Sequence, residues 1–301
     1  EEIFLKENPD LILVHGDTTT TFAGALAAFY QKIKVGHVEA GLRTYDKYFP
    51  FPEEMNRKLT GSIADIHFSP TIGSKNNLLK EGINEKQIFV TGNTVIDAMD
   101  FTVEDGYVFN NEELNKIDYN NKKVIMVTAH RRENWGEGIE NICISLKNIV
   151  ENNKDVEIVY LVHLNPVVKN IVYKHLEGVN RIHLLPPLDT KETHNLMNKC
   201  YMVMTDSGGL QEEAPHLGKP VLVLRDVTER PEAIKAGTVK LVGTNLNNII
   251  NEGNKLIRNR EEYNKMSKAV NPYGDGKASL RIVDFILYYY GLTNNPCKEF
   301  L

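Results

Sequence analysis

Cysteine is scarce in this chain, and its three copies stand far apart. Cys143, Cys200 and Cys297 are an odd number, and no two of them form a C-x-x-C pair. A disulfide framework and a cysteine-held metal site are therefore not expected, and free thiols are typical of a reducing compartment. Long apolar runs are also missing, since none approaches the roughly 20 residues of a membrane span. We expect a cytoplasmic protein without a membrane partner.

An excess of charge of one sign is absent as well. The 301 residues carry 35 Lys or Arg against 40 Asp or Glu, a formal net charge of -5. No broad basic surface for nucleic acid is predicted, so any phosphate must be held locally. The composition, 42% hydrophobic and 25% charged, is typical of a globular chain long enough for two domains.

Four motifs of common enzyme classes do not occur. The chain lacks the dinucleotide fingerprint G-x-G-x-x-G, the P-loop G-x-x-x-x-G-K-[ST], the zinc motif H-E-x-x-H and the hydrolase motif G-x-S-x-G. Their absence argues against dinucleotide redox chemistry and against most phosphoryl transfer, metallohydrolysis and acyl transfer. Neither a metal nor a cofactor is predicted.

What the chain does contain is an alternation of short β-branched runs with helical patterns. Ten runs stand out, at 11–14, 35–38, 66–69, 88–90, 123–128, 157–162, 181–185, 202–205, 220–224 and 239–242. They are apolar almost throughout, which is typical of parallel strands with both sheet faces covered by helices. Four runs precede and six follow the asparagine-rich stretch 105–123, which is predicted to be a surface linker or irregular helix between two lobes. The predicted fold class is α/β, with two Rossmann-like lobes.

The most informative motif is TDSGGLQEEA, residues 205–214. It predicts a strand that delivers Ser207, Gly208 and Gly209 to the start of a helix, where backbone N–H groups bind anions and glycines let a phosphate approach closely. Glu213 lies further along that helix and could accept hydrogen bonds from sugar hydroxyls. The alternative is an ordinary N-cap made by Asp206 or Ser207. The motif alone leaves both interpretations open.

Further polar residues follow predicted strands directly. Asp17, Glu39, His130, His163 and Ser207 each stand just past the end of a run. In open α/β sheets ligands bind at the carboxyl ends of the strands. Each residue also has a structural alternative: Asp17 can cap the next helix, Glu39 can pair with Arg43, and His130 can be a buried imidazole. Five at one edge favour a binding site.

Two more segments narrow the ligand class. Arg230, in TERPEA, supplies a cation for an anion site in the second lobe. Glu53, in PFPEEMNR, adds an acid to Asp17 and Glu39 of the first lobe, or is only a first-turn helix carboxylate. Together these residues favour a nucleotide-diphosphate sugar, with the nucleotide held by one lobe and the sugar handled between lobes.

The chain resembles the bacterial non-hydrolysing UDP-N-acetylglucosamine 2-epimerases over essentially its whole length. Nine motifs occur in the family's order: HGDTTTT, GHVEAGLRT, PFPEEMNR, TGNTVID, AHRREN, VHLNP, TDSGGLQEEAPHLGKPVLVLRD, TERPEA and NPYGDGKAS. Nine ordered motifs are far more specific than any one of them.

The resemblance implies a fold of the glycosyltransferase-B type and a homodimer. In this fold a final helix crosses back to the first lobe, and we predict such a helix over Ala278 to Tyr290, with Leu280, Val283, Ile286 and Tyr290 on its packed face. The expected lobes are then 1–95 with about 278–301, and 96–277. The family opens with a glycine-rich segment that would lie upstream of Glu1, so the chain as given is expected to be inactive or weakly active.

The implied reaction is inversion at C2, which interconverts UDP-N-acetylglucosamine and UDP-N-acetylmannosamine by elimination and re-addition of UDP through a 2-acetamidoglucal. The resemblance assigns the acid/base group to Asp17, Glu39, Glu53 and His130. Which carboxylate removes the C2 proton stays open, because neighbouring groups titrate together.

The resemblance assigns the nucleotide to the second lobe. Ser207, Gly208, Gly209 and Arg230 correspond to the diphosphate site, and Glu213 to the ribose contact. Some relatives bind a second UDP-N-acetylglucosamine as an activator, at positions that match Arg131 and His163.

Other functions stay open at this stage. Hydrolysing relatives release N-acetylmannosamine by admitting water to the same intermediate. A glycosyltransferase of the same fold would need no group of carboxylates near C2. A pure binding module would need no acid/base group at all.

Overall fold

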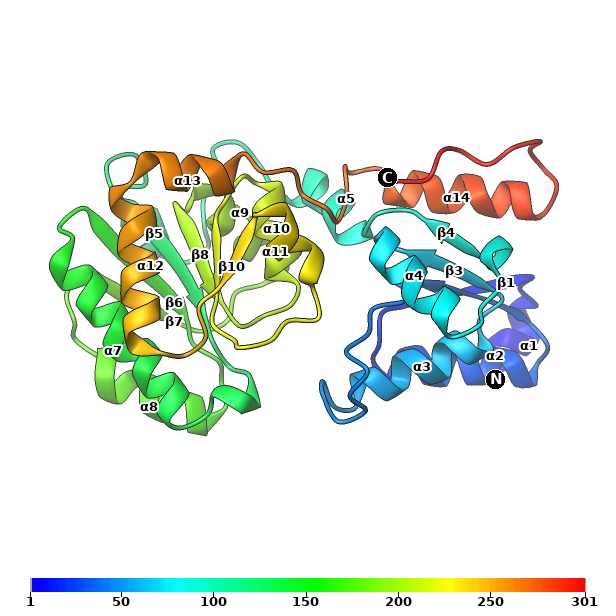
Figure 1. The fold of residues 1–301 in the computed structure, drawn as a ribbon, viewed down its shortest axis with the longest axis horizontal. Coiled ribbons are helices and arrows are strands. Elements are labelled where there is room, and N and C mark those ends of the chain that lie inside the picture. Colours follow the sequence, from blue (N-terminus) through cyan, green and yellow to red (C-terminus); the bar gives the residue numbers. More distant parts are fainter. Residues whose placement is uncertain (1, 301) are drawn as a thin grey trace. The chain divides into compact units, whose positions relative to one another are not determined.

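The computed structural model describes residues 2–300 and divides into two compact units, Glu1–Ala98 with Pro272–Leu301, and Met99–Asn271. Each unit contains one sheet, of four strands in the first and six in the second (Figure 1). The ten predicted strands are all present, and every ladder between them is parallel. The α/β fold class with two parallel-sheet lobes is therefore confirmed.

The four-stranded sheet runs in chain order: β1 (Leu11–His15), β2 (Lys34–Val38), β3 (Ile66–Ser69) and β4 (Ile88–Val90). Neighbouring parallel strands need crossovers, and these contain the helices α2 (Thr19–Tyr30), α3 (Glu53–Ile63), α4 (Ile72–Lys80) and the short η1 (Glu85–Gln87). Helix α1 (Glu2–Glu7) precedes β1, and α5 (Thr94–Thr102) runs through the boundary between the units. His15 pairs with Val38, so the chain leaves β1 and β2 at the same edge of the sheet.

Helix α14 (Ala278–Tyr289) covers one face of this sheet, while α2 packs on the other (Figure 1). Ile282 and Phe285 are buried, with the Phe285 ring centroid 4.6 Å from that of Phe89. The predicted packing face was wrong, because Leu280 and Val283 are 69% and 56% exposed. The helix is apolar on several sides, so more than one stripe has helical spacing, and the shape of the sheet selects among them.

The six-stranded sheet has the order β10 (Val239–Leu241), β9 (Val221–Val223), β8 (Met202–Thr205), β5 (Lys123–Thr128), β6 (Val156–Leu161) and β7 (Ile182–Leu185). The chain builds outward from β5 through β7 and then returns to β8 on the other side of β5. The carboxyl ends of β5 and β8 therefore form a topological switch point, where α/β sheets bind ligands. Its helices are α6 (Glu112–Lys116), η2 (Arg132–Asn134), α7 (Glu137–Asn152), α8 (Pro166–Leu176), α9 (Thr190–Lys199), α10 (Leu210–His216), α11 (Pro231–Ala236), α12 (Leu246–Arg258) and α13 (Arg260–Ser267).

The stretch 105–123 lies inside the second unit, so the predicted linker between the lobes was wrong, while the predicted irregular helix corresponds to the short helix α6. Phe109, Leu114 and Ile117 are buried, and Lys199 of α9 donates a hydrogen bond to the Tyr107 carbonyl at 2.5 Å. The frequent asparagines made the stretch look like a surface segment, but its three buried apolar residues pack it against the second unit.

The two cysteines of the second unit, Cys143 and Cys200, are buried free thiols, and burial raises the pKa of each to about 12. Within residues 2–300, no helix combines the length and apolarity needed to cross a membrane.

Candidate active site

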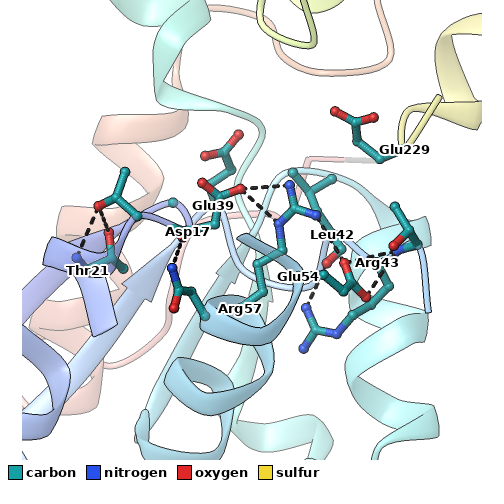
Figure 2. A network of polar contacts seen from close by, with 12 residues as sticks. Asp17, Thr21, Glu39, Leu42, Arg43, Glu54, Arg57 and Glu229 are labelled. Carbon is teal, nitrogen blue, oxygen red and sulfur yellow. Dashed lines mark hydrogen bonds and ion pairs between the residues drawn. The ribbon is translucent and has the colours of Figure 1, made fainter. Parts of the chain in front are cut away.

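In the first unit, Asp17 lies just past β1 and is held from two directions. Arg57 of α3 contacts its Oδ2 with Nε at 2.9 Å and Nη2 at 2.7 Å, and Asn56 donates to its backbone carbonyl at 2.9 Å (Figure 2). Asp17 is not the cap of α2, since the hydroxyl of Thr18 accepts the hydrogen bond from the Thr21 backbone at that end. Its carboxylate is thus oriented by side chains of α3.

Arg57 is itself anchored by Glu54. The Nη1 of Arg57 lies 3.2 Å from Glu54 Oε2, and both side chains are buried. Glu54 also accepts hydrogen bonds from the backbone N–H groups of Thr44 and Tyr45, at 3.1 and 2.9 Å. A buried carboxylate with these partners fixes the guanidinium and, through it, Asp17. The sequence predictions missed both roles, although the i,i+3 spacing of Glu54 and Arg57 was a usable signal.

Glu39 follows β2 and adopts a left-handed backbone conformation, with φ of 64°. Such a conformation costs a non-glycine residue about 1–3 kcal/mol, so the surrounding contacts must hold it in place. The carboxylate accepts a hydrogen bond from Asn93 Nδ2 at 3.3 Å and lies 3.8 Å from His15 Nε2. Its predicted alternative partner, Arg43, instead pairs with Glu81 at 2.8 and 2.9 Å.

Glu53 is the first residue of α3, in the same turn as Glu54. It therefore lies at the end of the helix whose Asn56 and Arg57 contact Asp17. In the first unit, then, Asp17 and Glu39 leave adjacent strands at one edge, and Glu53 begins the helix that orients Asp17.

In the second unit, the switch point carries a pocket of about 250 Å³ whose lining includes His130, His163, Ser207, Leu188 and Leu210. The rings of His130 and His163 are stacked, with centroids 5.1 Å apart and an interplanar angle of 19°. Burial lowers the pKa of His130, while the charge of Asp206 opposes that shift. Three predicted residues, His130, His163 and Ser207, thus share one pocket.

Ser207, Gly208 and Gly209 connect β8 to α10, as the motif predicts. The N-cap alternative was wrong, because α10 begins after Gly209 without a side-chain cap. A Cβ at Gly208 would overlap the Arg230 guanidinium and lie 2.8 Å from Glu229 Oε1, and one at Gly209 would lie 3.0 Å from Glu213 Oε1. Gly208 therefore needs the small size of glycine, whereas a side chain at Gly209 would require Glu213 to shift slightly.

Arg230 belongs to a buried ion network that the sequence did not predict. Its guanidinium contacts Glu212 at 2.5 Å and Glu229 at 2.6 Å, and Glu229 also accepts from Arg225 at 2.9 Å. Arg225 in turn pairs with Glu133 at 2.7 Å. Burial alone would raise the pKa of Glu229, but Arg230 and Arg225 outweigh burial and lower it to about 2. The Arg230 guanidinium is thus fixed against Gly208.

The remaining candidates also lie in the second unit. Glu213 Oε2 is 3.3 Å from His194 Nε2, and the other nitrogen of that ring is 2.6 Å from the Thr102 hydroxyl. Arg131 donates its backbone N–H to Asp206 at 2.8 Å, and its buried Nε has no hydrogen-bond partner among residues 2–300. His163 Nδ1 accepts from the Asn165 backbone at 3.1 Å.

Comparison with known proteins gives matches to one family over almost the whole chain. Residues 1–287 match the sequence model of the family described as UDP-N-acetylglucosamine 2-epimerase. The Bacillus subtilis UDP-N-acetylglucosamine 2-epimerase is 56% identical over 300 residues, which cover 100% of this chain and 78% of that protein. A Clostridium acetobutylicum relative, provisionally given the same name, is 75% identical over the same shares of the two chains.

Solved structures agree with the sequence relatives. The S. aureus MnaA structure with UDP has a TM-score of 0.94 and 50% identity, and covers 100% of this chain and 81% of its own. The Neisseria meningitidis UDP-GlcNAc 2-epimerase bound to UDP-GlcNAc has a TM-score of 0.89 and 50% identity, with 95% and 78% covered. This chain therefore belongs to the UDP-N-acetylglucosamine 2-epimerase family.

Proposed function

We propose that this protein interconverts UDP-N-acetylglucosamine and UDP-N-acetylmannosamine without net hydrolysis. Family membership supports a 2-epimerase acting on this nucleotide sugar. The observation that carries the finer proposal is the fixed Asp17 carboxylate, held by Arg57 and Asn56 in the first unit. A binding module would not need a carboxylate oriented in this way.

The second unit would hold the nucleotide. The turn of Ser207, Gly208 and Gly209 would bind the diphosphate. Gly208 leaves room for the Arg230 guanidinium, a cation whose orientation is set by Glu212 and Glu229. Glu213 would accept hydrogen bonds from the ribose hydroxyls.

The first unit would supply the carboxylates, and the second unit the histidine, for the proton transfers. C2 is not next to a carbonyl, so its proton can leave only as the C1–O bond breaks and the electrons of that bond leave with UDP. The C2–H electrons then form the C1–C2 double bond of a 2-acetamidoglucal. A proton returns to the opposite face of C2 while UDP adds back to C1. We assign these proton transfers to Asp17, Glu39 and Glu53 of the first unit and to His130 of the second.

Two further parts of the proposal concern partners. Arg131 and His163 would contact a second molecule of UDP-N-acetylglucosamine that activates the enzyme, and the protein would act as a homodimer. A rate that is sigmoidal in substrate concentration supports the first, and a doubled mass in solution supports the second. A hyperbolic rate and a monomeric mass contradict them.

The test is incubation of the protein with UDP-N-acetylglucosamine in deuterated water. We expect UDP-N-acetylmannosamine to form, with deuterium at C2 of both nucleotide sugars. Long incubation at high enzyme concentration makes even slow exchange measurable. Free N-acetylmannosamine with stoichiometric UDP would favour the hydrolysing reaction, and unlabelled, unchanged substrate would contradict both.

A further inference from the structure

Asp206, directly after β8, is a fully buried carboxylate that ties together the segment following β5. Its Oδ2 accepts three hydrogen bonds, from the backbone N–H groups of His130 and Arg131 at 2.8 Å each and from Asn134 Nδ2 at 2.9 Å. One carboxylate oxygen is thus saturated by donors that all lie within five residues of chain. The contact spans the two strands of the switch point, β5 and β8.

The other oxygen faces the His130 ring. Asp206 Oδ1 is buried, has no hydrogen-bond partner among the described residues 2–300, and lies 3.6 Å from His130 Nδ1. A buried carboxylate oxygen without a donor costs free energy. If the distance between Oδ1 and Nδ1 shortened by about 0.8 Å, the two atoms would form a charge-assisted N–H···O bond of ordinary length. An Nδ1–H on His130 is the donor that this geometry requires.

The His130 ring is also held in its plane. It stacks on His163 at 5.1 Å, and the Trp135 indole donates to the His130 carbonyl at 3.0 Å. With Nδ1 against Asp206, the second nitrogen, Nε2, lies on the far side of the imidazole. His130 itself lines the pocket at the switch point.

We propose that Asp206 is a positioning residue that holds His130 in the Nδ1–H tautomer, so that Nε2 is the nitrogen that exchanges a proton with the bound ligand. The role of His130 in proton transfer rests on the proposed function, whereas the tautomer of its ring does not. In the proposed reaction Nε2 takes up the C2 proton while the C2–H electrons form the C1–C2 double bond and UDP departs, and in the reverse direction it returns a proton to C2 as UDP adds back. Asp206 stabilises the imidazolium that exists between these two steps. The titratable and charged groups that face the ring are Asp206, Glu133, Arg131 and His163. Burial, Arg131 and His163 lower the pKa of His130 and keep the ring neutral near neutral pH, against the opposing effect of both carboxylates.

The experiment is NMR of the protein carrying isotope-labelled histidine, recorded at about pH 8, where an ordinary histidine is neutral. The His130 signals are assigned from their loss in a His130→Gln variant. In the unmodified protein we expect the proton on Nδ1. In Asp206→Asn, the amide oxygen takes the place of Oδ2 and its NH₂ group faces Nδ1, so the proton should move to Nε2.

Asn134→Ala is the matched control, because it removes one donor to Oδ2 and leaves Oδ1 in place. It should keep the Nδ1–H tautomer, whereas Asp206→Asn should also lower the His130 pKa, because it removes a negative charge that raises it. A proton on Nε2 in the unmodified protein overturns the proposal, even if the Asp206 variant does not fold. So does an unchanged tautomer in Asp206→Asn. No substrate enters these measurements, so a failed deuterium test would count against the proposed function alone.

Discussion

Arg57 holds the carboxylate of Asp17 with two nitrogens, Nε at 2.9 Å and Nη2 at 2.7 Å from Oδ2. The guanidinium is buried and also compensates Glu54. Arg57→Met keeps the apolar stem but leaves two carboxylates without their cation. We expect the free energy of unfolding, measured in urea, to fall by about 3 kcal/mol.

Lys265 is the control for this loss, since its pairs with Glu261 and Glu262 lie at the surface. Lys265→Met should change the unfolding free energy by less than about 0.5 kcal/mol. Equal losses in the two variants would show that the Arg57 pairs contribute no more than surface ion pairs.

Asp17→Asn and Glu39→Gln should abolish proton exchange at C2 and leave UDP binding unchanged. Both substitutions preserve shape while removing a proton acceptor, and positioned acid/base groups typically contribute 10²–10⁴-fold in rate. The UDP contacts proposed above all lie in the second unit. Deuterium incorporation gives the first quantity and isothermal titration calorimetry with UDP gives the second. Exchange at the original rate in both variants would remove these residues from the mechanism.

Gly208→Ala should weaken UDP binding by at least about tenfold, or 1.4 kcal/mol. The added methyl group overlaps the Arg230 guanidinium, which is fixed by Glu229 and cannot move away without breaking its ion pairs. Gly138→Ala is the control, because its Cβ meets Thr244 at an ordinary 3.4 Å. Isothermal titration calorimetry measures the UDP affinity of both variants. Equal affinities would show that the diphosphate does not bind next to Gly208.

Two buried histidines should make the protein less stable in acid. Burial lowers the pKa of His37 and of His67 from 6.5 to about 4. Between pH 6.5 and pH 4 these histidines are protonated in the unfolded chain but neutral in the folded chain. The free energy of unfolding is therefore highest above pH 6.5 and falls as the pH drops towards 4. At pH 5 each histidine should cost about 2 kcal/mol relative to pH 7.

Urea unfolding at the two pH values measures this loss. His67→Gln removes one of the two groups and should roughly halve the pH-dependent part, whatever its effect on stability at pH 7. A pH dependence identical to that of the unmodified protein would show that His67 titrates normally in the folded state.

Phe285→Ala should destabilise the first unit by about 3–5 kcal/mol, since this ring packs between Phe89 and Phe68 at centroid distances of 4.6 and 5.8 Å. Leu280→Ala on the same helix removes a side chain that is 69% exposed and should change stability little. Thermal or urea unfolding measures both changes. A larger loss for Leu280→Ala would mean that the helix packs by the face first predicted from the sequence.

Much of this protein can be predicted from local sequence patterns. Runs such as 88–90 are apolar at every position, and such runs form strands whose two faces are both covered, wherever they lie in the fold. The same logic locates Asp17 and Ser207 at strand ends, because a polar residue that follows a buried strand directly must leave the sheet there. Gly208 was recognised as a point of close approach for a similar reason, since the motif places it between a strand and a helix.

The partners of these residues could not be predicted, because they are supplied by chain segments far away in sequence. Spacing allows Asp17 to cap a helix and Glu39 to pair with Arg43, yet packing brings Arg57 to the first and Asn93 to the second. Asp206 reaches back 76 residues to His130 only because β8 pairs with β5. Hydrophobic periodicity reports that a residue is buried, but only the assembled sheet decides which surface buries it and which charge lies opposite.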